Sequence, residues 1–276
     1  MRVGIDARLL HYQQGGISQY TLHLVEALAE VEREDTFTVF LSRKGRPIQS
    51  QRPNLRRRLL WTPPHHRLEQ LLLPLELSFT DIDILHSPDF IQPLRRRFKS
   101  VITIHDLAFL RFPHLVTEES RRYYGQVTKT VANAEGIIAV SEWTRRDLLE
   151  LAEAPEERTR VIHSAVDRRF RPLEDRRPVQ RFCEERGLPL GFILWVGTLE
   201  PRKNLDTLLR AMALLQEREP GRYMLVAVGA KGWLYESALQ LLDQLRIGEH
   251  VMLYGPASVD ELLMLHNAAS LFVFPS

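Results

Sequence analysis

The stretch ILWVGTLEPRKN, residues 193–204, indicates the architecture of the chain. Its four apolar residues read as a buried strand that ends at Gly197, and a short loop then carries Arg202 and Lys203 to the start of the next helix. In open parallel α/β sheets ligands bind beyond the carboxyl ends of the strands, and helix N-termini favour anions. The junction therefore predicts a diphosphate site. The alternative is a solvated basic helix start, which the helix macrodipole mildly disfavours.

Outward from this stretch, short apolar runs alternate with longer amphipathic ones over the whole chain. The pattern predicts strands at 2–6, 36–42, 83–87, 100–106, 136–140, 160–164, 191–197, 223–229, 250–255 and 270–275. It predicts helices at 17–31, 66–79, 117–134, 141–151, 204–218, 233–246 and 259–268. Pro74 should bend or break the helix that contains it.

A charged segment with two prolines, residues 165–178, separates the two strand–helix series and reads as a linker. Repeated strand–helix units with apolar strands predict parallel sheets covered on both faces. We therefore expect an α/β protein with two doubly wound, Rossmann-like domains, residues 1–170 and 171–276.

Composition places the chain among soluble, cytoplasmic proteins. Of its 276 residues 44% are hydrophobic and 26% charged, and no apolar run reaches the length of about 18 residues that a membrane-spanning helix needs. The start MRVGIDARLL lacks the features of a signal peptide. The one cysteine, Cys183, excludes an internal disulfide, and no Cys/His spacing suggests a structural zinc site.

Positive charge is unevenly distributed although the net charge is only +2. Residues 43–67 contain eight basic residues and no acidic one, and RRRFK follows at 95–99. One interpretation is a solvated, arginine-rich surface. The other is attraction to an anionic membrane or an anionic acceptor. Nucleic acid is disfavoured, because aromatic residues are not interleaved and no nucleic-acid motif is present.

Further candidate residues follow the strands of the first series. Gly15 and Gly16 in QQGGIS would let backbone approach a ligand closely at a helix start, or merely form a flexible turn. His86 lies in HSPDF, and His105 with Asp106 ends the strand at 100–106. A histidine there could share a proton or bind a sugar hydroxyl, or be a satisfied histidine at a strand end.

Together, these motifs resemble the retaining glycosyltransferases of family 4, which have the two-domain GT-B fold. The matching elements occur in family order and span nearly the whole chain: GIDAR…GGISQY, LHSPDF, TIHDL, VSEWTRRDL, VIHSAVDRRFRP, VGTLEPRKN and LFVFPS. The resemblance implies transfer of a sugar from a nucleotide donor with retained anomeric configuration. It also implies that the N-terminal half binds the acceptor and the C-terminal half the donor.

Site residues follow from the same resemblance. Gly15 and Gly16 match the glycine loop that approaches the donor diphosphate and sugar, and His105 matches the active-site histidine at the interdomain cleft. Lys203 matches the lysine that contacts the donor diphosphate.

One position departs from the family pattern. Many relatives have arginine directly after the strand-end glycine, where this chain has Thr198, and Arg202 is the plausible substitute. Further candidates for the cleft are His86, Asp106, Thr198 and Asn204.

The resemblance also implies the chemical partners. The subgroup with an EPRKN ending favours mannosyl transfer, with GDP-mannose as the donor. No metal and no cofactor are expected, because cationic side chains and helix dipoles neutralise the leaving group. The acceptor would be a glycan or a lipid-linked sugar, which fits a basic surface at the inner face of the cell membrane.

The last residues, SLFVFPS at 270–276, read as a buried strand. In most relatives a segment resembling EGFGLPxLEAMA follows, with two glutamates that hold the donor sugar and ribose. The sequence ends before such a segment, and we therefore expect a truncated chain whose second domain is incomplete.

Two alternatives to a transferase stay open. One is an inactive fragment that binds a nucleotide-sugar or a glycan, and the other is a sugar-nucleotide 2-epimerase. Hydrolysis or transfer of the donor separates enzyme from binder, and epimerisation separates the two enzymes. A nicotinamide oxidoreductase is disfavoured, because the GxGxxG fingerprint is absent.

Overall fold

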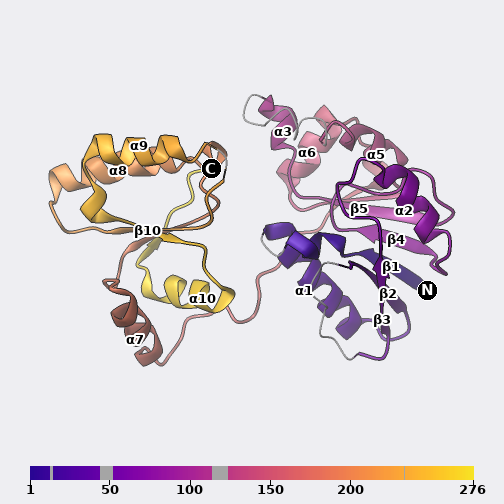
Figure 1. The fold of residues 1–276 in the computed structure, drawn as a ribbon, viewed down its shortest axis with the longest axis horizontal. Coiled ribbons are helices and arrows are strands. Elements are labelled where there is room, and N and C mark those ends of the chain that lie inside the picture. The colour runs from indigo at the N-terminus through magenta and orange to yellow at the C-terminus, as the bar shows by residue number, and fades with distance from the viewer. Residues whose placement is uncertain (13–14, 44–51, 114–123, 233) are drawn as a thin grey trace. The chain divides into compact units, whose positions relative to one another are not determined.

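The computed structural model describes residues 1–12, 15–43, 52–113, 124–232 and 234–276. The chain forms two compact units, Met1–Ala165 and Val166–Ser276, each with its own parallel sheet (Figure 1). The division lies five residues before the predicted boundary at 170/171.

Unit 1 is built on a seven-stranded parallel sheet with the strand order β3-β2-β1-β4-β5-β6-β7. The strands are β1 (Arg2–Asp6), β2 (Thr36–Ser42), β3 (Leu55–Leu60), β4 (Ile84–Ser87), β5 (Lys99–Ile104), β6 (Gly136–Ala139) and β7 (Thr159–Val161). Its helices are α1 (Gly16–Val31), α2 (Glu69–Leu77), α3 (Ala108–Arg111), α5 (Val127–Asn133) and α6 (Glu142–Leu151), with 3-10 turns η1 (Arg8–Tyr12) and η3 (Glu156–Arg158).

Helices α1 and α2 cover opposite faces of this sheet. Val39 packs against α1, whereas the next residue of β2, Phe40, packs against Leu73 and Leu77 of α2. Adjacent residues of a strand point to opposite faces, so the two helices enclose the strand between them. This is the doubly wound arrangement that the alternating sequence predicts.

Unit 2 has a four-stranded parallel sheet with the order β10-β9-β8-β11. Its strands are β8 (Ile193–Val196), β9 (Leu225–Val228), β10 (Val251–Gly255) and β11 (Leu271–Phe272). Its helices are α7 (Arg177–Arg186), α8 (Leu205–Arg218), α9 (Glu236–Leu245) and α10 (Val259–Ala268), with 3-10 turns η4 (Pro201–Lys203) and η5 (Gly248–His250). Trp195 packs among α8 and α9, and its neighbour Leu194 packs among α7 and α10 on the other face.

Three elements differ from the sequence-based expectation. β3 was not predicted, because three arginines, Arg56 to Arg58, hide its pattern. It is an edge strand, where charged side chains are common because they hinder pairing with other chains. α7 was also not predicted, although Val179, Phe182 and Cys183 are buried at helical spacing. Helix α2 continues through Pro74 to Leu77.

Two further expectations are met in part. Of the helix predicted at 117–134, residues 114–123 lie outside the described residues, and α5 occupies 127–133. The strand predicted at 270–275 is two residues long and pairs only with β8. Leu271 and Phe272 are about half exposed, because β11 lies at the edge of the four-stranded sheet.

Glycines lie at the carboxyl ends of three neighbouring strands of unit 2, where the backbones approach closely. The N–H of Gly197 donates to the Val228 carbonyl, and the N–H of Gly229 donates to the Gly255 carbonyl, both at 2.9 Å. A Cβ added at Gly229 would lie 1.8 Å from the carbonyl oxygen of Gly197. The backbones after β8 and β9 therefore approach so closely that no side chain fits between them.

This close approach yields a stability prediction. Gly229→Ala should lower the free energy of unfolding of unit 2 by roughly 3 kcal/mol or more, because steric overlap adds to an unfavourable positive φ. Gly221→Ala is the matched control, since Gly221 also has a positive φ but faces open space. Gly221→Ala should lower the free energy of unfolding by about 1–2 kcal/mol. Urea unfolding of both variants measures the difference, and equal losses would refute the steric argument.

Candidate active site

The predicted diphosphate site of unit 2 lies in the loop between β8 and α8. Arg202 and Lys203 belong to the 3-10 turn η4, directly before α8. The guanidinium of Arg202 is 2.7 Å from a carboxylate oxygen of Glu200, whose side chain is buried. The ammonium of Lys203 lies 4.9 Å above the ring of Phe274. The structure thus brings both cations to the carboxyl edge of the sheet.

The loop that follows β9 supports this cation-bearing loop. Leu199 pairs with Lys231 in an isolated parallel bridge. A Cβ at Gly232 would come within 2.8 Å of Thr198 Cγ2 and 2.9 Å of the Leu199 carbonyl oxygen. Thr198 is itself exposed, at the position where many relatives have arginine.

Asn204 ties the same loop to the segment after β11. Its backbone has a positive φ of 52°. The nitrogen of its side-chain amide donates to the Pro275 carbonyl at 3.1 Å. The hydroxyl of Thr207 donates to its amide oxygen at 2.7 Å. The role of Asn204 in this structure is therefore to shape the turn from η4 into α8, and contact with a ligand stays a prediction.

In unit 1, His105 follows β5 and is half-buried. Its Nε2 is 2.9 Å from the carbonyl oxygen of Pro88, and a carbonyl can only accept, so Nε2 carries a hydrogen. In the neutral ring Nδ1 then has a lone pair that can accept a hydrogen bond from a hydroxyl. The ring of Tyr20 packs edge-on against His105 at 4.9 Å between centroids and holds its orientation.

His86 belongs to β4 and is buried. Its Nε2 is 2.9 Å from the hydroxyl of Thr103, which is 3.4 Å from the hydroxyl of Tyr20. Burial, aided by the nearby charge of His105, lowers the pKa of His86 to about 4, so the ring is neutral near pH 7. His86 thus supports Tyr20 and His105 through Thr103.

Tyr20 and Thr103 were not singled out as site residues. The sequence carries one weak signal, because Thr103 is a polar residue between Ile102 and Ile104 in a buried strand.

The remaining candidates of unit 1 have local backbone roles. A carboxylate oxygen of Asp106 accepts from the N–H of Ala108 at 3.1 Å and begins the short helix α3. Gly15 has a φ of 128°, which L-residues rarely adopt, and Gly16 is the first residue of α1. Added Cβ atoms at both glycines would meet open space. Among the described residues no side chain caps the start of α1.

A buried ion cluster at the carboxyl end of β1 was also missed by sequence reasoning. Arg8 is 2.7 Å from a carboxylate oxygen of Asp6 and 2.6 Å from one of Glu69, and donates to the Thr62 carbonyl at 3.1 Å. Burial alone would lower the pKa of Arg8, but the two carboxylates raise it, so the charge is kept. Burial raises the pKa of Glu69. The cluster fastens the start of α2 to β1.

Comparison with known proteins assigns the family. The model of Glycosyltransferase Family 4 matches residues 14–170, more than half of the chain. The model of Glycosyl transferases group 1 matches residues 179–276. Because the first match covers more than half of the chain, the chain belongs to Glycosyltransferase Family 4. The cations of the β8–α8 loop lie within the group 1 match, and His105 lies within the other.

Curated relatives include two mannosyltransferases of Escherichia coli. The O-antigen chain mannosyltransferase B is 25% identical over 292 residues, covering 100% of this chain and 76% of that protein. The serotype-specific mannosyltransferase WbdA is 29% identical over 184 residues, covering 65% of this chain but 23% of that protein. The chain is thus similar to mannosyltransferases over all or part of its length.

Solved structures support the GT-B fold. Sucrose-phosphate synthase from Thermosynechococcus elongatus superposes with a TM-score of 0.77 at 18% identity, covering 100% of this chain and 75% of that one. At this level of identity the likeness concerns the fold alone.

Within the described ranges, no group of three or more His, Cys, Asp or Glu side chains is placed to hold a metal ion. No helix in the same ranges is both long and apolar enough to cross a bilayer. The expectation that catalysis needs neither metal nor cofactor stays a prediction.

The lowered pKa of His86 predicts an acid-dependent loss of stability. An unfolded chain binds a proton on this histidine near pH 6.5, whereas the folded chain does so near pH 4. The stabilisation is therefore complete above about pH 6.5 and is lost as the pH falls towards 4. Between about pH 7 and pH 5 the contribution of His86 should fall by about 2 kcal/mol.

Urea unfolding of the parent and of His86→Gln at both pH values tests this. Because other groups titrate equally in both proteins, the difference between them isolates His86. From about pH 7 to about pH 5, the free energy of unfolding should fall by about 2 kcal/mol more in the parent than in the variant. Identical pH dependence of the two proteins would show that His86 is not buried as described.

Proposed function

We propose that this chain is a retaining hexosyltransferase that moves mannose from GDP-mannose to a glycan or lipid-linked acceptor. The observation that carries the proposal is the pair Arg202 and Lys203 between the end of β8 and the start of α8. Similarity to mannosyltransferases supports the choice of sugar. We also propose that unit 1 binds the acceptor and unit 2 the donor.

Unit 2 would stabilise the departing nucleotide. When the bond between the anomeric carbon and the diphosphate oxygen breaks, negative charge accumulates on the diphosphate. The positive charges of Arg202 and Lys203 would stabilise this developing negative charge. The N–H groups at the start of α8 would stabilise it as well. The acceptor hydroxyl oxygen forms the new bond to the anomeric carbon, and its proton passes to the departing diphosphate.

Unit 1 would orient sugar hydroxyls. Nε2 of His105 is committed to the Pro88 carbonyl, so we propose that Nδ1 accepts a hydrogen bond from a sugar hydroxyl. The edge-on contact with Tyr20 keeps the ring from rotating. The N–H groups of the α1 start, beyond Gly15, would bind a further anionic or hydroxyl group.

The donor site is tested by calorimetric titration with GDP and with guanosine. Lys203→Ala should weaken GDP binding by roughly 1.5–3 kcal/mol, the range for hydrogen bonds to charged groups. Arg202→Ala should weaken GDP binding by less, because the Glu200 carboxylate already offsets part of the charge of Arg202. Guanosine binding should not change.

Arg210→Ala is the matched control, since Arg210 is an exposed cation further along α8. It should bind GDP like the parent. If Lys203→Ala weakens GDP and guanosine equally, or not at all, the diphosphate does not bind in this loop.

The role of His105 is tested by transfer rates from GDP-mannose. His105→Ala should lower the rate by roughly 10²-fold or more, the scale of a positioned polar group. His105→Asn, which places an acceptor near the position of Nδ1, should keep more activity than His105→Gln, which places a donor near Nε2. His23→Ala, at a partly exposed position of α1, should leave the rate unchanged.

A rate for His105→Ala near that of the parent would contradict this assignment. Binding of GDP-mannose without transfer by the parent chain would favour the alternative of a nucleotide-sugar binder.

A further inference from the structure

Helix α6 of unit 1 carries an exposed tryptophan in its first turn. Trp143 is the second residue of α6, which begins shortly after the end of β6. Its exposed fraction is 73%, although tryptophan is among the side chains that bury the most apolar surface when they pack. Because Cα–Cβ bonds tilt towards the N-terminus of a helix, the side chain of Trp143 starts out towards the carboxyl edge of the sheet, where α6 begins.

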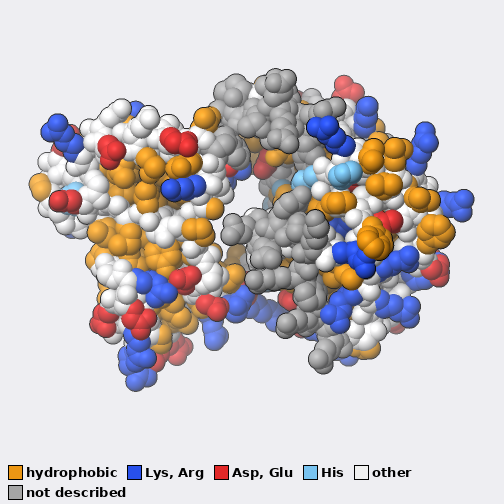
Figure 2. All heavy atoms as spheres, in the orientation of Figure 1, with side chains coloured by type: hydrophobic (Ala, Val, Ile, Leu, Met, Phe, Trp, Pro, Cys, Tyr) orange, Lys and Arg blue, Asp and Glu red, His pale blue; other side chains and the backbone are white. Residues whose placement is uncertain are grey.

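A cation holds one face of this ring. The guanidinium of Arg146, one turn further along α6, lies 4.9 Å from the ring centroid of Trp143. Attraction between the cation and the electron-rich face restrains the ring, and its high exposure leaves the opposite face open to solvent. In Figure 2 Lys and Arg side chains are spread over much of unit 1, so a cation beside a ring does not by itself mark a site. The position of the ring does.

The start of α6 is tied to the strand end that carries His105. The hydroxyl of Thr144, the residue after Trp143, donates to the His105 carbonyl at 3.3 Å. The N–H of Thr144 donates to the hydroxyl of the N-cap residue Ser141 at 3.1 Å. These two bonds fix the first turn of α6 beside β5, and Trp143 is therefore held next to the histidine that we propose binds a sugar hydroxyl.

A second imidazole follows the next strand of the sheet. His163 comes after β7 and is exposed. Its Nδ1 is 3.2 Å from the carbonyl oxygen of Val140, and a carbonyl can only accept, so Nδ1 carries a hydrogen. Nε2 of the neutral ring then has a lone pair for a ligand hydroxyl. His105 is anchored in the same manner to the Pro88 carbonyl.

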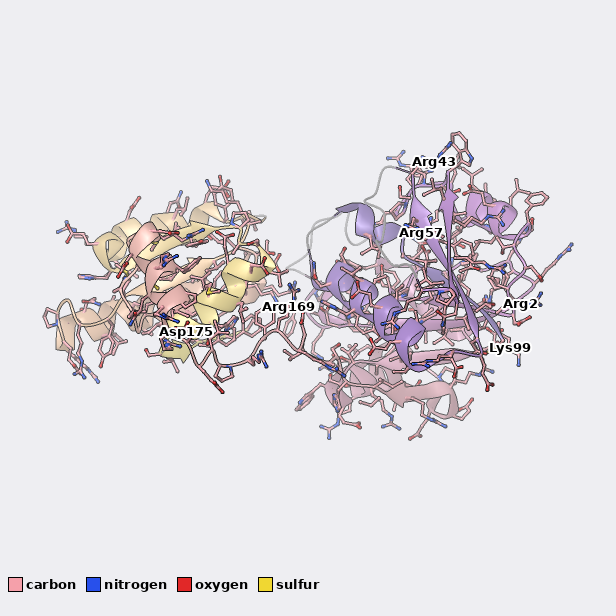
Figure 3. All side chains as sticks on the ribbon, turned by 90° about the horizontal axis from the view of Figure 1, so that it is seen from below. Arg2, Arg43, Arg57, Lys99, Arg169 and Asp175 are labelled. Carbon is pink, nitrogen blue, oxygen red and sulfur yellow. The ribbon has the colours of Figure 1, made fainter. Side chains whose placement is uncertain are left out.

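These three groups lie along one edge of the sheet. β5, β6 and β7 are neighbours, and His105, Trp143 and His163 follow their carboxyl ends in that order. Figure 3 labels Arg2 and Lys99, the first residues of β1 and β5, which lie at the opposite, amino edge. Neighbouring strands are about 4.8 Å apart, so the ends of β5 and β7 are about 10 Å apart. A disaccharide spans this distance.

We propose that Trp143 and His163 form a second sugar subsite for the acceptor, beside the sugar that is bound at His105. The apolar C–H face of a pyranose would stack on the open face of the indole, and one of its hydroxyls would donate to Nε2 of His163. The acceptor is then an oligosaccharide rather than a single sugar. This inference rests on the proposed function, which supplies the sugar at His105 and its identity as mannose.

The pattern of groups favours a glycan over a protein partner. A pyranose combines an apolar face with hydroxyl donors around its rim, which matches one aromatic ring flanked by two imidazole acceptors. A stable protein interface needs about 800 Å² on each partner, far more than one indole and one imidazole supply.

Acceptor kinetics with GDP-mannose test the subsite. The KM for α-linked mannobioses, divided by the KM for methyl α-mannoside, should rise about tenfold in Trp143→Ala, because only the disaccharide reaches the indole. Trp143→Phe keeps an aromatic face and should restore most of the parent ratio. His163→Ala should raise the ratio about fivefold, because a hydrogen bond is lost.

Fluorescence without any donor gives a readout that does not depend on transfer. A mannobiose that stacks on Trp143 should change the tryptophan emission of the parent chain. Trp143→Phe should remove this change, whereas Trp61→Phe should keep it.

Matched controls come from the other end of the same sheet. Trp61 follows the edge strand β3, is 76% exposed and has the Arg43 guanidinium 3.6 Å from its ring centroid, so it repeats the exposure and the cation of Trp143. His66 is an exposed histidine of the same region. Trp61→Ala and His66→Ala should keep the KM ratio of the parent, and thermal unfolding checks that every variant is folded.

The outcomes separate this proposal from the proposed function. Mannobiose binding that requires Trp143, in a parent chain that transfers no sugar, would refute the transferase and support the subsite. Transfer by the parent, with the same KM ratio in Trp143→Ala, would refute the subsite and leave the transferase.

Two further results would overturn the subsite. One is a parent emission that no mannobiose changes. The other is a parent dimer that Trp143→Ala dissociates, which would assign the ring to a second copy of the chain.

Discussion

The close approach of two backbones at Gly197 and Gly229 is the constraint on which unit 2 depends. With 1.8 Å between a Cβ at Gly229 and the Gly197 carbonyl oxygen, no other residue fits without moving a strand. The contact fixes where β8 ends and hence where the following loop begins. The Lys203 side chain lies against this point, because a Cβ added at Gly197 would be 3.6 Å from Lys203 Cγ.

Unit 1 positions its polar groups differently, through buried partners. His86 reaches Tyr20 through Thr103, and Tyr20 packs on His105. The buried side chains of His86 and Thr103 are partners of one another, which avoids the cost of burying either unpaired. The ion cluster around Arg8 likewise positions the start of α2, because Arg8 pairs with both Asp6 and Glu69. The helix that it anchors also exposes Leu71 and Leu75.

The sequence predicted most strands because their apolar runs are short and bounded, as in β1, β2 and β6. It missed β3, whose three arginines leave little alternation, and α7, whose charged residues outnumber its three buried ones. Of the site, strand-end position and charge pointed to His105, Arg202 and Lys203. Tyr20 and Arg8 were missed because Thr103 and His105, which Tyr20 contacts, and Glu69, which pairs with Arg8, are distant in sequence and meet them only in the folded chain.

The central claim is that the loop from β8 to α8 binds the diphosphate of a nucleotide-sugar. A crystal structure of the chain with GDP tests this most directly. The account predicts the diphosphate at the start of α8, within hydrogen-bond distance of the Lys203 ammonium. A diphosphate bound elsewhere on the chain, with Lys203 still above the ring of Phe274, would contradict it.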